Sequence, residues 1–401
     1  MVIKLDKIFD SASKGSIFKD RYVLQTNYTP ETIPHRDKEI EQIASILAPC
    51  LRKERPSNLF VYGLTGTGKT ISIQYVRNEL LKRAENDNHG GSLRIEYLNC
   101  KLRKVADTEY RILAELIKKL GGSVPSTGLP TDQVYNKFIE LIEKENQLLI
   151  LVLDEVDQAV KKTSDSFLYN LTRLNSELNK TQISIIGISN DLRFLDNLDP
   201  RVRSSLSEEE IIFPPYNALQ LKDILKNRSK QAFHDNALGE GVIEKCAAYA
   251  AREHGDARRA LDLLRVSGEI AERQNSKKIE VNHMDIANNK IERDKILDVI
   301  ETQPKQFQLT LLAIMNLSNK DQRIFTGEVY ENYREMCKKT STDILTQRRI
   351  SSIISEFDML GLINAKNISR GTYGKTREIR SAIPNEIEEQ VKGILKDSLG
   401  V

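Results

Sequence analysis

Short runs of apolar residues alternate with helix-like segments over the first half of the chain. The apolar runs occupy residues 59–62, 93–98, 148–153 and 183–189. Between them, apolar residues recur every three or four positions, as on one face of a helix, in residues 110–120, 134–144 and 167–178. Short, wholly apolar strands that alternate with helices are typical of a parallel sheet covered on both faces. The pattern therefore predicts an α/β fold for this part of the chain.

The pattern changes after the segment Phe-Pro-Pro-Tyr at residues 213–216. Residues 219–231, 241–254, 257–273 and 283–300 are all helical in pattern, and no strand-like run separates them. Three more helical patterns follow at 307–317, 326–339 and 346–360, and then two short strand-like segments flank a basic turn. Three helices followed by a two-stranded hairpin predict a winged helix. We therefore predict an arm (1–33), an α/β core (34–216), a helical lid (217–302) and a winged-helix domain (303–401).

Length and composition fit such a chain of several domains. The 401 residues are enough for two or three cores, and an apolar fraction of 39% with 29% charged residues is ordinary for a soluble protein. The longest apolar run, 148–153, is too short to cross a bilayer, and the first residues lack the apolar core of a signal peptide. Four scattered cysteines suggest neither a zinc site nor disulfides. We expect a cytoplasmic protein without membrane contact.

The clearest chemical signal lies between the first apolar run and the helical pattern at 71–80. The eight residues there are Gly63, Leu64, Thr65, Gly66, Thr67, Gly68, Lys69 and Thr70. Glycines let backbone N–H groups surround phosphate oxygens, a lysine at this position reaches the β- and γ-phosphates, and the threonine hydroxyl can bind Mg²⁺. The helix that begins here, with Ile71 in its first turn, adds its positive dipole end. A glycine-rich linker could imitate this loop, but a strand before it and a helix after it favour nucleotide binding.

Polar residues follow two of the other predicted strands. Asp154 and Glu155 come directly after the run 148–153. Such a pair suits phosphoryl transfer, with the aspartate holding Mg²⁺ through water and the glutamate acting as general base. Asn190 follows the run 183–189, where its amide could bind the attacking water and the γ-phosphate; a turn-forming asparagine would be the better interpretation only if this residue stood alone.

Three arginines are candidates for further phosphate contacts. Arg201 and Arg203 follow a proline turn, from which a guanidinium could reach the γ-phosphate held by a neighbouring subunit. Most surface arginines are merely solvated, so the position alone does not decide this role. Arg258 lies in the first turn of a predicted lid helix that Asp256 would cap, and it could point back at a bound nucleotide.

The order and spacing of these landmarks resemble the AAA+ ATPases, and more specifically the archaeal origin-recognition and helicase-loader family. That family is related to the eukaryotic origin recognition complex. The segments that carry the resemblance are residues 29–31, 34–39, 61–70, 153–157, 212–216 and 255–261. The resemblance implies ATP or ADP with Mg²⁺ in the phosphate loop, Pro34, Arg36 and Tyr216 near the adenine, and Arg258 at the phosphates.

The resemblance also implies a function. A member of this family is expected to be an ATP-regulated replication initiator that binds origin duplex DNA and helps recruit or load a helicase of the minichromosome maintenance type. Its hydrolysis would be a slow switch, and its partners would include identical or paralogous subunits. Two alternatives stay open from the residues: a phosphate-loop ATPase that regulates transcription or signalling through a winged helix, and a motor that hydrolyses ATP continuously.

Candidate DNA contacts lie in two places. The resemblance implies a helical insertion at roughly residues 99–122 that touches DNA, where Lys101, Arg103 and Lys104 could meet phosphates or simply be solvated. On the helix at 346–360, Arg348, Ser352 and Ser355 fall opposite the apolar face, beside Gln347, and would face a major groove. The basic turn supplies wing candidates for a narrow minor groove: Arg370, Gly371, Thr372, Tyr373 and Lys375. Protein contacts remain an alternative use of a winged helix.

Overall fold

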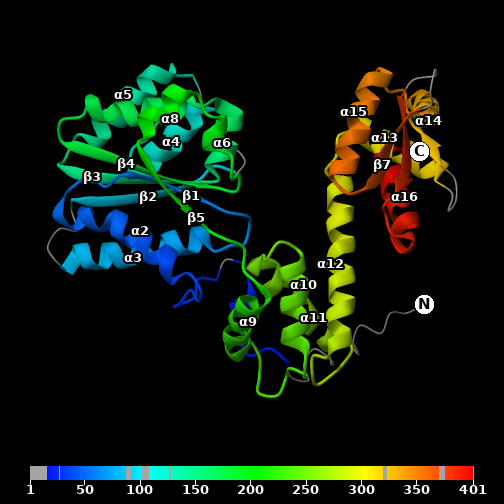
Figure 1. Ribbon diagram of the computed structural model, residues 1–401. Coiled ribbons are helices and arrows are strands. Elements are labelled where there is room, and N and C mark those ends of the chain that lie inside the picture. The colour runs from blue at the N-terminus through cyan, green and yellow to red at the C-terminus, as the bar shows by residue number, and fades with distance from the viewer. Residues whose placement is uncertain are drawn as a thin grey trace. The chain divides into compact units, whose positions relative to one another are not determined.

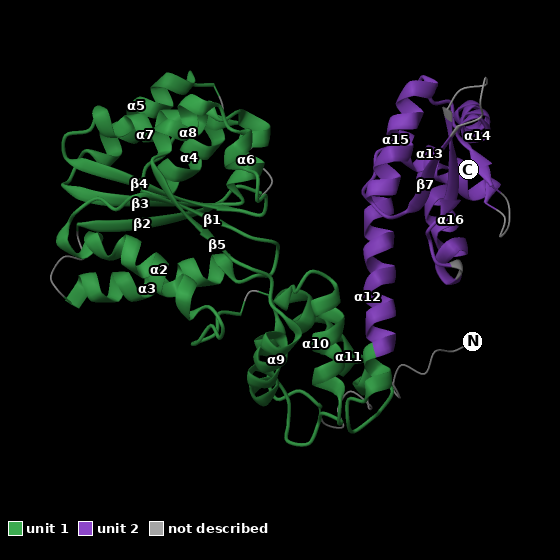
Figure 2. Ribbon diagram, in the orientation of Figure 1, with its two compact units in different colours: residues 1–284 green, residues 285–401 purple. Residues whose placement is uncertain are grey.

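The chain divides into two compact units. The computed structural model describes residues 16–26, 28–86, 92–101, 108–125, 128–318, 323–369 and 375–400. The units comprise residues 1–284 and 285–401, which Figure 2 shows in green and purple. The division falls inside helix α12 (Val281–Glu301), so this helix contributes residues to both units.

A five-stranded parallel sheet forms the centre of the first unit. Its strands are β1 (Asn58–Tyr62), β2 (Leu93–Asn99), β3 (Gln147–Asp154), β4 (Thr181–Ser189) and β5 (Glu208–Ile212), in the order β2-β3-β4-β1-β5. Each predicted apolar run forms a strand, so the α/β prediction is confirmed. The apolar pattern misses β5, because this strand lies at the sheet edge and begins with three glutamates that keep it polar.

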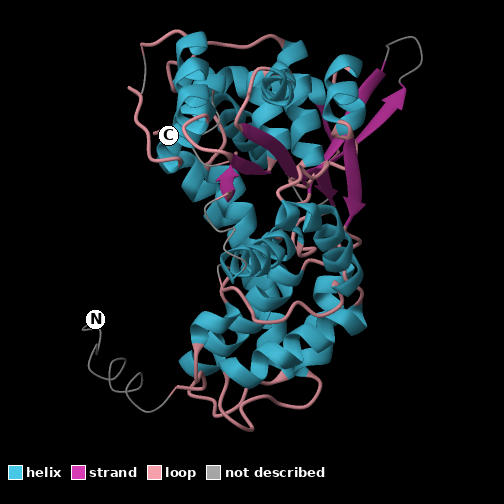
Figure 3. Ribbon diagram, turned by 90° about the vertical axis from the view of Figure 1, so that its left-hand side faces the viewer, coloured by secondary structure: helices cyan, strands magenta, loops and turns pink. Residues whose placement is uncertain are grey.

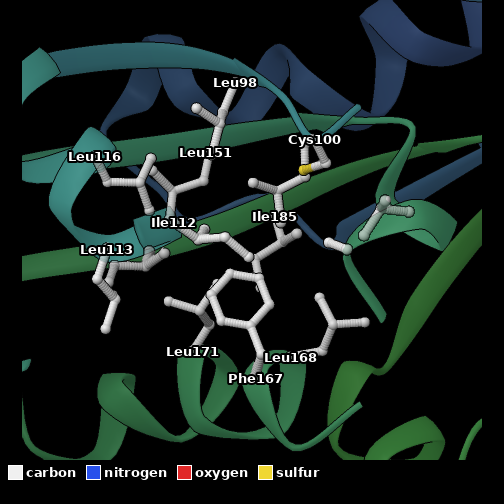
Figure 4. Close-up of a cluster of buried hydrophobic side chains, with 14 of the residues drawn as sticks. Leu98, Cys100, Ile112, Leu113, Leu116, Leu151, Phe167, Leu168, Leu171 and Ile185 are labelled. Carbon is white, nitrogen blue, oxygen red and sulfur yellow. The ribbon is translucent and has the colours of Figure 1, made fainter. Parts of the chain in front are cut away.

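Helices cover both faces of this sheet, which explains why the strands are wholly apolar. The helices are α2 (Asp37–Leu47), α3 (Lys69–Asn86), α4 (Glu109–Lys119), α5 (Thr131–Ile142), α6 (Val156–Thr163), α7 (Ser166–Arg173) and α8 (Pro200–Leu206). Figure 1 shows α2 and α3 on one face and α4, α5, α6 and α8 on the other. On the face covered by α4 and α7, Leu151 and Ile185 of the sheet belong to one buried cluster with Leu116 and Phe167 of these helices (Figure 4).

Three helices follow β5 within the first unit: α9 (Ala218–Ala232), α10 (Val242–Arg252) and α11 (Ala257–Arg273). Figure 3 draws this region, at the bottom of that view, as helices and loops. A capping box starts α9, because Asn217 Oδ1 accepts from the Gln220 N–H at 2.9 Å and Gln220 Oε1 accepts from the Asn217 N–H at 3.0 Å. Within the described residues, no helix is both long and apolar enough to span a membrane.

The described part of the N-terminal arm packs on the lid helices, although it precedes the sheet in sequence. It contains a short 3-10 helix, η1 (Arg21–Leu24). The other described 3-10 helices belong to the α/β core and are η2 (Ala48–Arg52), η3 (Leu174–Ser176) and η4 (Leu195–Asn197). The rings of Phe18 and Phe233 lie 4.9 Å apart. The Glu272 carboxylate accepts hydrogen bonds from Ser16 Oγ at 2.5 Å and from the Ile17 N–H at 2.9 Å. These contacts fix the arm to α9 and α11.

The second unit has the predicted winged-helix architecture. Its helices are α13 (Lys305–Leu317), α14 (Thr326–Lys339), α15 (Gln347–Met359) and α16 (Asn385–Leu399). An antiparallel sheet of β6 (Ile324–Phe325), β8 (Lys375–Ser381) and β7 (Ile363–Ser369), in that order, completes the unit. The sequence reasoning missed α16, although buried Ile387, Val391 and Leu395 recur at helical spacing. It also missed β6, which is only two residues long.

Candidate nucleotide site and winged-helix surface

A cavity of about 480 Å³ lies where the sheet, the lid and the arm meet in the first unit. The predicted site residues that line it are Pro34, Thr65, Gly66, Thr67, Gly68, Lys69, Thr70, Ile71, Asp154, Glu155, Asn190, Tyr216 and Arg258. They come from the segment before α2, from the carboxyl ends of strands, from the start of α3 and from the lid, so folding brings together residues more than 200 positions apart. Gly63, Leu64, Arg36, Arg201 and Arg203 are not part of the described cavity wall.

The phosphate loop connects β1 to α3, as predicted. Gly66 (φ +73°) and Gly68 (φ +95°) adopt left-handed backbone conformations that glycine tolerates best. Lys69 Nζ donates to the carbonyl oxygens of Gly63 (2.7 Å) and Leu64 (2.8 Å) and to Asn190 Oδ1 (2.8 Å). Burial lowers the pKa of Lys69 to about 8, although the nearby Asp154 carboxylate acts in the opposite direction.

Asp154 and Thr70 are hydrogen-bonded to each other in the wall of the cavity. Asp154 Oδ2 accepts from Thr70 Oγ1 at 2.9 Å and from the Tyr97 hydroxyl at 2.6 Å, and its Oδ1 accepts from the Glu155 N–H at 2.9 Å. Carboxylate and hydroxyl oxygens are ligands that suit Mg²⁺. Among the described residues, no group of three or more His, Cys, Asp and Glu side chains is arranged so that it could hold a metal ion by itself. Mg²⁺ beside phosphates needs only one or two protein ligands, so the residues present fit it.

The sequence reasoning missed Tyr97, which also lines the cavity. It lies near the end of β2, beside Val152 of β3. Burial, followed by the negative charge of Asp154, raises the pKa of Tyr97 above its ordinary value. The sequence does show a tyrosine two residues before the end of β2. To recognise it as a site residue one must know that β2 pairs with β3, and the apolar pattern does not give the strand order.

Glu155 adopts a left-handed backbone conformation (φ +54°), which is uncommon for a residue with a side chain. Its Oε2 lies 3.6 Å from Lys101 Nζ. Lys101, a candidate for DNA contact, is therefore paired with the predicted general base, and its side chain is 72% exposed. The other insertion candidates, Arg103 and Lys104, lie outside the described residues.

The start of α11 joins the lid to the phosphate loop. The Ala257 N–H donates to the Gly66 carbonyl oxygen at 3.2 Å. Asp256 caps the helix, as predicted, by accepting from the backbone N–H groups of Arg258 (2.7 Å) and Arg259 (3.2 Å). Arg258 therefore lines the cavity from a helix end that is hydrogen-bonded to the loop.

Arg201 and Arg203 occupy the short helix α8, outside the cavity wall. The Arg201 side chain is 86% exposed and lies 3.3 Å from Asp199 Oδ1, and the Arg203 side chain is 46% exposed and lies 3.1 Å from Asp196 Oδ1. Both guanidiniums thus face the surface of the unit, as an arginine that acts on a neighbouring subunit must.

The winged-helix candidates on α15 differ in their availability. Gln347 and Arg348 are exposed, and the Arg348 side chain forms no ion pair or hydrogen bond with another described residue. Ser352 Oγ donates to the Arg348 carbonyl oxygen at 3.3 Å. Ser355 Oγ accepts from Arg377 Nη1 at 2.5 Å, so β8 engages a hydroxyl that the sequence places on the open polar face.

The wing candidates cannot be placed in the same way. Arg370, Gly371, Thr372 and Tyr373 lie outside the described residues, and of Lys375 only the backbone at the start of β8 is described.

Comparisons with known protein families match three parts of the chain. Residues 32–186 match the family described as AAA ATPase domain. Residues 222–289 match the Cdc6 AAA+ ATPase-type lid domain, and residues 298–390 match the CDC6 C-terminal winged helix domain. The ATPase domain, the lid and the winged helix thus follow one another in the predicted order.

Similar proteins span nearly the whole chain. An ORC1-type DNA replication protein of Pyrococcus abyssi is 51% identical over 384 residues, covering 94% of this chain and 90% of the relative. The ORC1-type DNA replication protein 1 of Methanosarcina mazei is 49% identical over 397 residues, covering 98% and 94%. Among solved structures, the Aeropyrum pernix ORC1 protein in complex with DNA is 43% identical, with a TM-score of 0.85 over 96% of this chain and 98% of that one.

Proposed function

This chain belongs to the family of ORC1-type DNA replication proteins, and from that premise we propose that it is an ATP-regulated initiator that binds origin duplex DNA. It would then help to recruit or load the replicative helicase. The observation that carries the DNA-binding part is the likeness, over nearly all of both chains, to the Aeropyrum pernix ORC1 protein solved in complex with DNA. The ATPase domain supports nucleotide binding and hydrolysis.

The nucleotide would lie in the cavity between core and lid. Lys69 and Arg258 would neutralise its phosphates, and Pro34 and Tyr216 supply apolar surface for the base. Thr70 and Asp154 would hold Mg²⁺, which adds charge neutralisation when bound. Glu155 would accept a proton from the attacking water.

Hydrolysis is proposed to be a slow switch, not a source of continuous work. Asn190 Oδ1 accepts from Lys69 Nζ at 2.8 Å, so the asparagine lies beside a proposed phosphate ligand, from where it would also orient the attacking water. The second guanidinium would come from Arg201 or Arg203 of an identical or paralogous subunit. A helicase of the minichromosome maintenance type is the further proposed partner.

The DNA would meet the start of α15. Arg348, with Gln347 and Ser352 beside it, would read base edges in the major groove. The turn between β7 and β8, with Arg370 and Tyr373, would enter the minor groove. Arg103 and Lys104 would add phosphate contacts from the insertion.

The test of DNA binding compares two neighbouring arginines. Arg348→Ala should weaken binding to a specific duplex by about tenfold or more and change the base preference, since a bidentate arginine–guanine contact is worth about 1–3 kcal/mol. Arg349→Ala is the matched control, because Arg349 lies 3.8 Å from Glu356 and over the Phe307 ring. Fluorescence anisotropy titrations measure both. Equal losses for the two variants, without a changed base preference, would contradict the proposed contact.

A second experiment separates an initiator from a promoter regulator. Chromosomal occupancy of the protein should cluster at one or a few replication start sites. Occupancy spread over many promoters, with none at the start sites, would count against the proposed function.

A further inference from the structure

We infer that Arg36 is a positioning residue that fixes the phosphate loop to the hinge between core and lid, and that it does not bind the base. The inference rests on the proposed nucleotide site and deepens it. It assigns Arg36 to phosphate binding through the protein backbone, without a contact to the nucleotide.

The guanidinium of Arg36 is held inside the protein. Arg36 is only 1% exposed. Its Nε donates to the Thr67 carbonyl oxygen at 2.8 Å, and its Nη2 donates to the Pro214 carbonyl oxygen at 2.5 Å. The guanidinium carbon lies 3.9 Å from the centroid of the Tyr216 ring, and Nη1 lies 3.3 Å from Glu39 Oε1. A buried charge needs such partners, so they account for its position away from the cavity.

The bond to Thr67 sets the direction of a phosphate-binding group. Thr67 lies between two glycines in left-handed conformations, where the backbone has the greatest freedom. In a planar trans peptide the C=O and the following N–H point in opposite directions. Arg36 holds the Thr67 carbonyl on its own side, away from the cavity, and this leaves the Gly68 N–H on the opposite side of that peptide, toward the cavity where phosphates would bind. Without Arg36, the Thr67–Gly68 peptide would become ordered only when the nucleotide binds, and the lost conformational entropy would weaken the binding of phosphates.

The same arginine belongs to a network of hydrogen bonds that connects the phosphate loop, the hinge segment 214–216 and the start of α11. From Pro214 the chain passes to Tyr216, whose N–H donates to the Gly255 carbonyl oxygen at 3.3 Å. Two residues later, the Ala257 N–H donates to the Gly66 carbonyl oxygen at 3.2 Å. Adjacent peptides of the loop are therefore tied to the hinge, one through Arg36 and one through α11. A shift in the loop on phosphate binding would reach Arg258 by both routes.

The experiment separates phosphate binding from base binding. Arg36→Lys keeps the charge and loses the planar fork that bonds two carbonyls. Displacement of a fluorescent ATP analogue by ATP, by GTP and by inorganic tripolyphosphate gives three affinities. We expect ATP and tripolyphosphate to bind more weakly by the same factor, about tenfold or more, with the preference for ATP over GTP unchanged. Arg77→Lys is the matched control, since Arg77 bonds the Ile95 carbonyl oxygen at 3.1 Å and touches neither loop nor hinge.

Two results would overturn the inference. Unchanged tripolyphosphate affinity with a reduced preference for ATP would make Arg36 a ligand of the base. Unchanged affinity for all three competitors would leave it without a role in the site. Thermal unfolding without nucleotide verifies the fold, and Arg36→Gln, which also removes the buried charge, should give the same pattern if the lysine variant unfolds. A wild-type chain that bound no ATP would instead contradict the proposed function, and the inference with it, before any variant is compared.

A double variant tests the connection to the lid. Combined in one chain, Arg36→Lys and Arg258→Ala should reduce ATP affinity by a factor smaller than the product of the two single factors, because both residues act through one hydrogen-bond network. Arg77→Lys combined with Arg258→Ala should be multiplicative. Multiplicative effects in both pairs would overturn the connection.

Discussion

The buried ammonium of Lys69 couples nucleotide binding to protonation. Burial lowers its pKa to about 8, whereas phosphates at Nζ would raise the pKa again, so binding above pH 8 takes up a proton. We expect ATP affinity to fall by about tenfold between about pH 7 and pH 9. Calorimetry in two buffers of different ionisation enthalpy should show uptake of about one proton at the higher pH. A flat affinity profile without proton uptake would contradict this coupling.

Gly255 is the residue where a single methyl group should disturb the hinge. Its φ of +67° is left-handed, and an added Cβ would lie 2.3 Å from the Tyr216 carbonyl oxygen. Gly255→Ala should therefore lower the free energy of opening the hinge by at least about 1–2 kcal/mol, measured by hydrogen exchange of α11. Gly393→Ala in α16, where the added Cβ meets nothing within 4 Å, is the control and should be neutral or stabilising. Similar exchange of α11 in both variants would refute the prediction.

The sequence predicts site residues whose role follows from a local motif. It misses residues whose role depends on a contact with an element that is distant in the sequence. Lys69 and Asp154 are recognisable because each carries the required group within a short local pattern: Lys69 follows the glycine loop after β1, and Asp154 ends the apolar strand β3. Tyr97 bonds Asp154 only because β2 lies beside β3, and a strand order is not written in a pattern of apolar runs. Ser355 lies on the predicted polar face of its helix, but Arg377 from a later strand engages it.

Among the elements, the first described residues of the arm share one carboxylate of α11. Glu272 accepts from Ser16 Oγ, from the Ile17 N–H and from Arg21 Nη2, the last at 2.7 Å. Glu272→Gln should weaken the attachment by about 1 kcal/mol, a value reduced because the pair is partly exposed, and so speed amide exchange over residues 17–24 by about fivefold. Glu244→Gln, which removes the partner of Lys222 on the lid without touching the arm, should leave that exchange unchanged. Equal effects of the two variants would contradict the prediction.

Strands that are covered on both faces could be predicted, and the strand at the edge could not. The run 148–153 is wholly apolar because helices pack on both sides of β3. In β5 the side chains of Glu209 and Glu210 are exposed, and its pairing with β1 gives this polar segment its strand conformation. Tertiary pairing, which a local pattern does not contain, decides such elements.

For the whole molecule, the sequence predicts the order of the domains along the chain. It does not give the number of chains that contribute residues to one nucleotide site. Besides Arg258, the described cavity wall contains Arg228, whose guanidinium donates to the Val23 carbonyl oxygen and lies over the Tyr28 ring, whereas Arg201 and Arg203 do not line the cavity. If these arginines act between subunits, two defective chains should complement each other. Lys69→Ala would hold no nucleotide but would carry both arginines. The double variant Arg201→Ala and Arg203→Ala would bind ATP but lack them.

We expect each variant alone to hydrolyse ATP near the background rate, because an arginine of this kind contributes about 10³-fold or more. Mixed on duplex DNA, they should recover measurable hydrolysis, as followed by phosphate release. The control mixture pairs the double variant with a Lys69→Ala chain that also lacks both arginines, and it should stay inactive. Both arginines lie on the outside of their own unit, with the Arg201 side chain 86% exposed, so a second chain could reach them without a change in α8. Hydrolysis that the mixture fails to restore, while the double variant still binds ATP, would place these arginines outside the reaction between subunits.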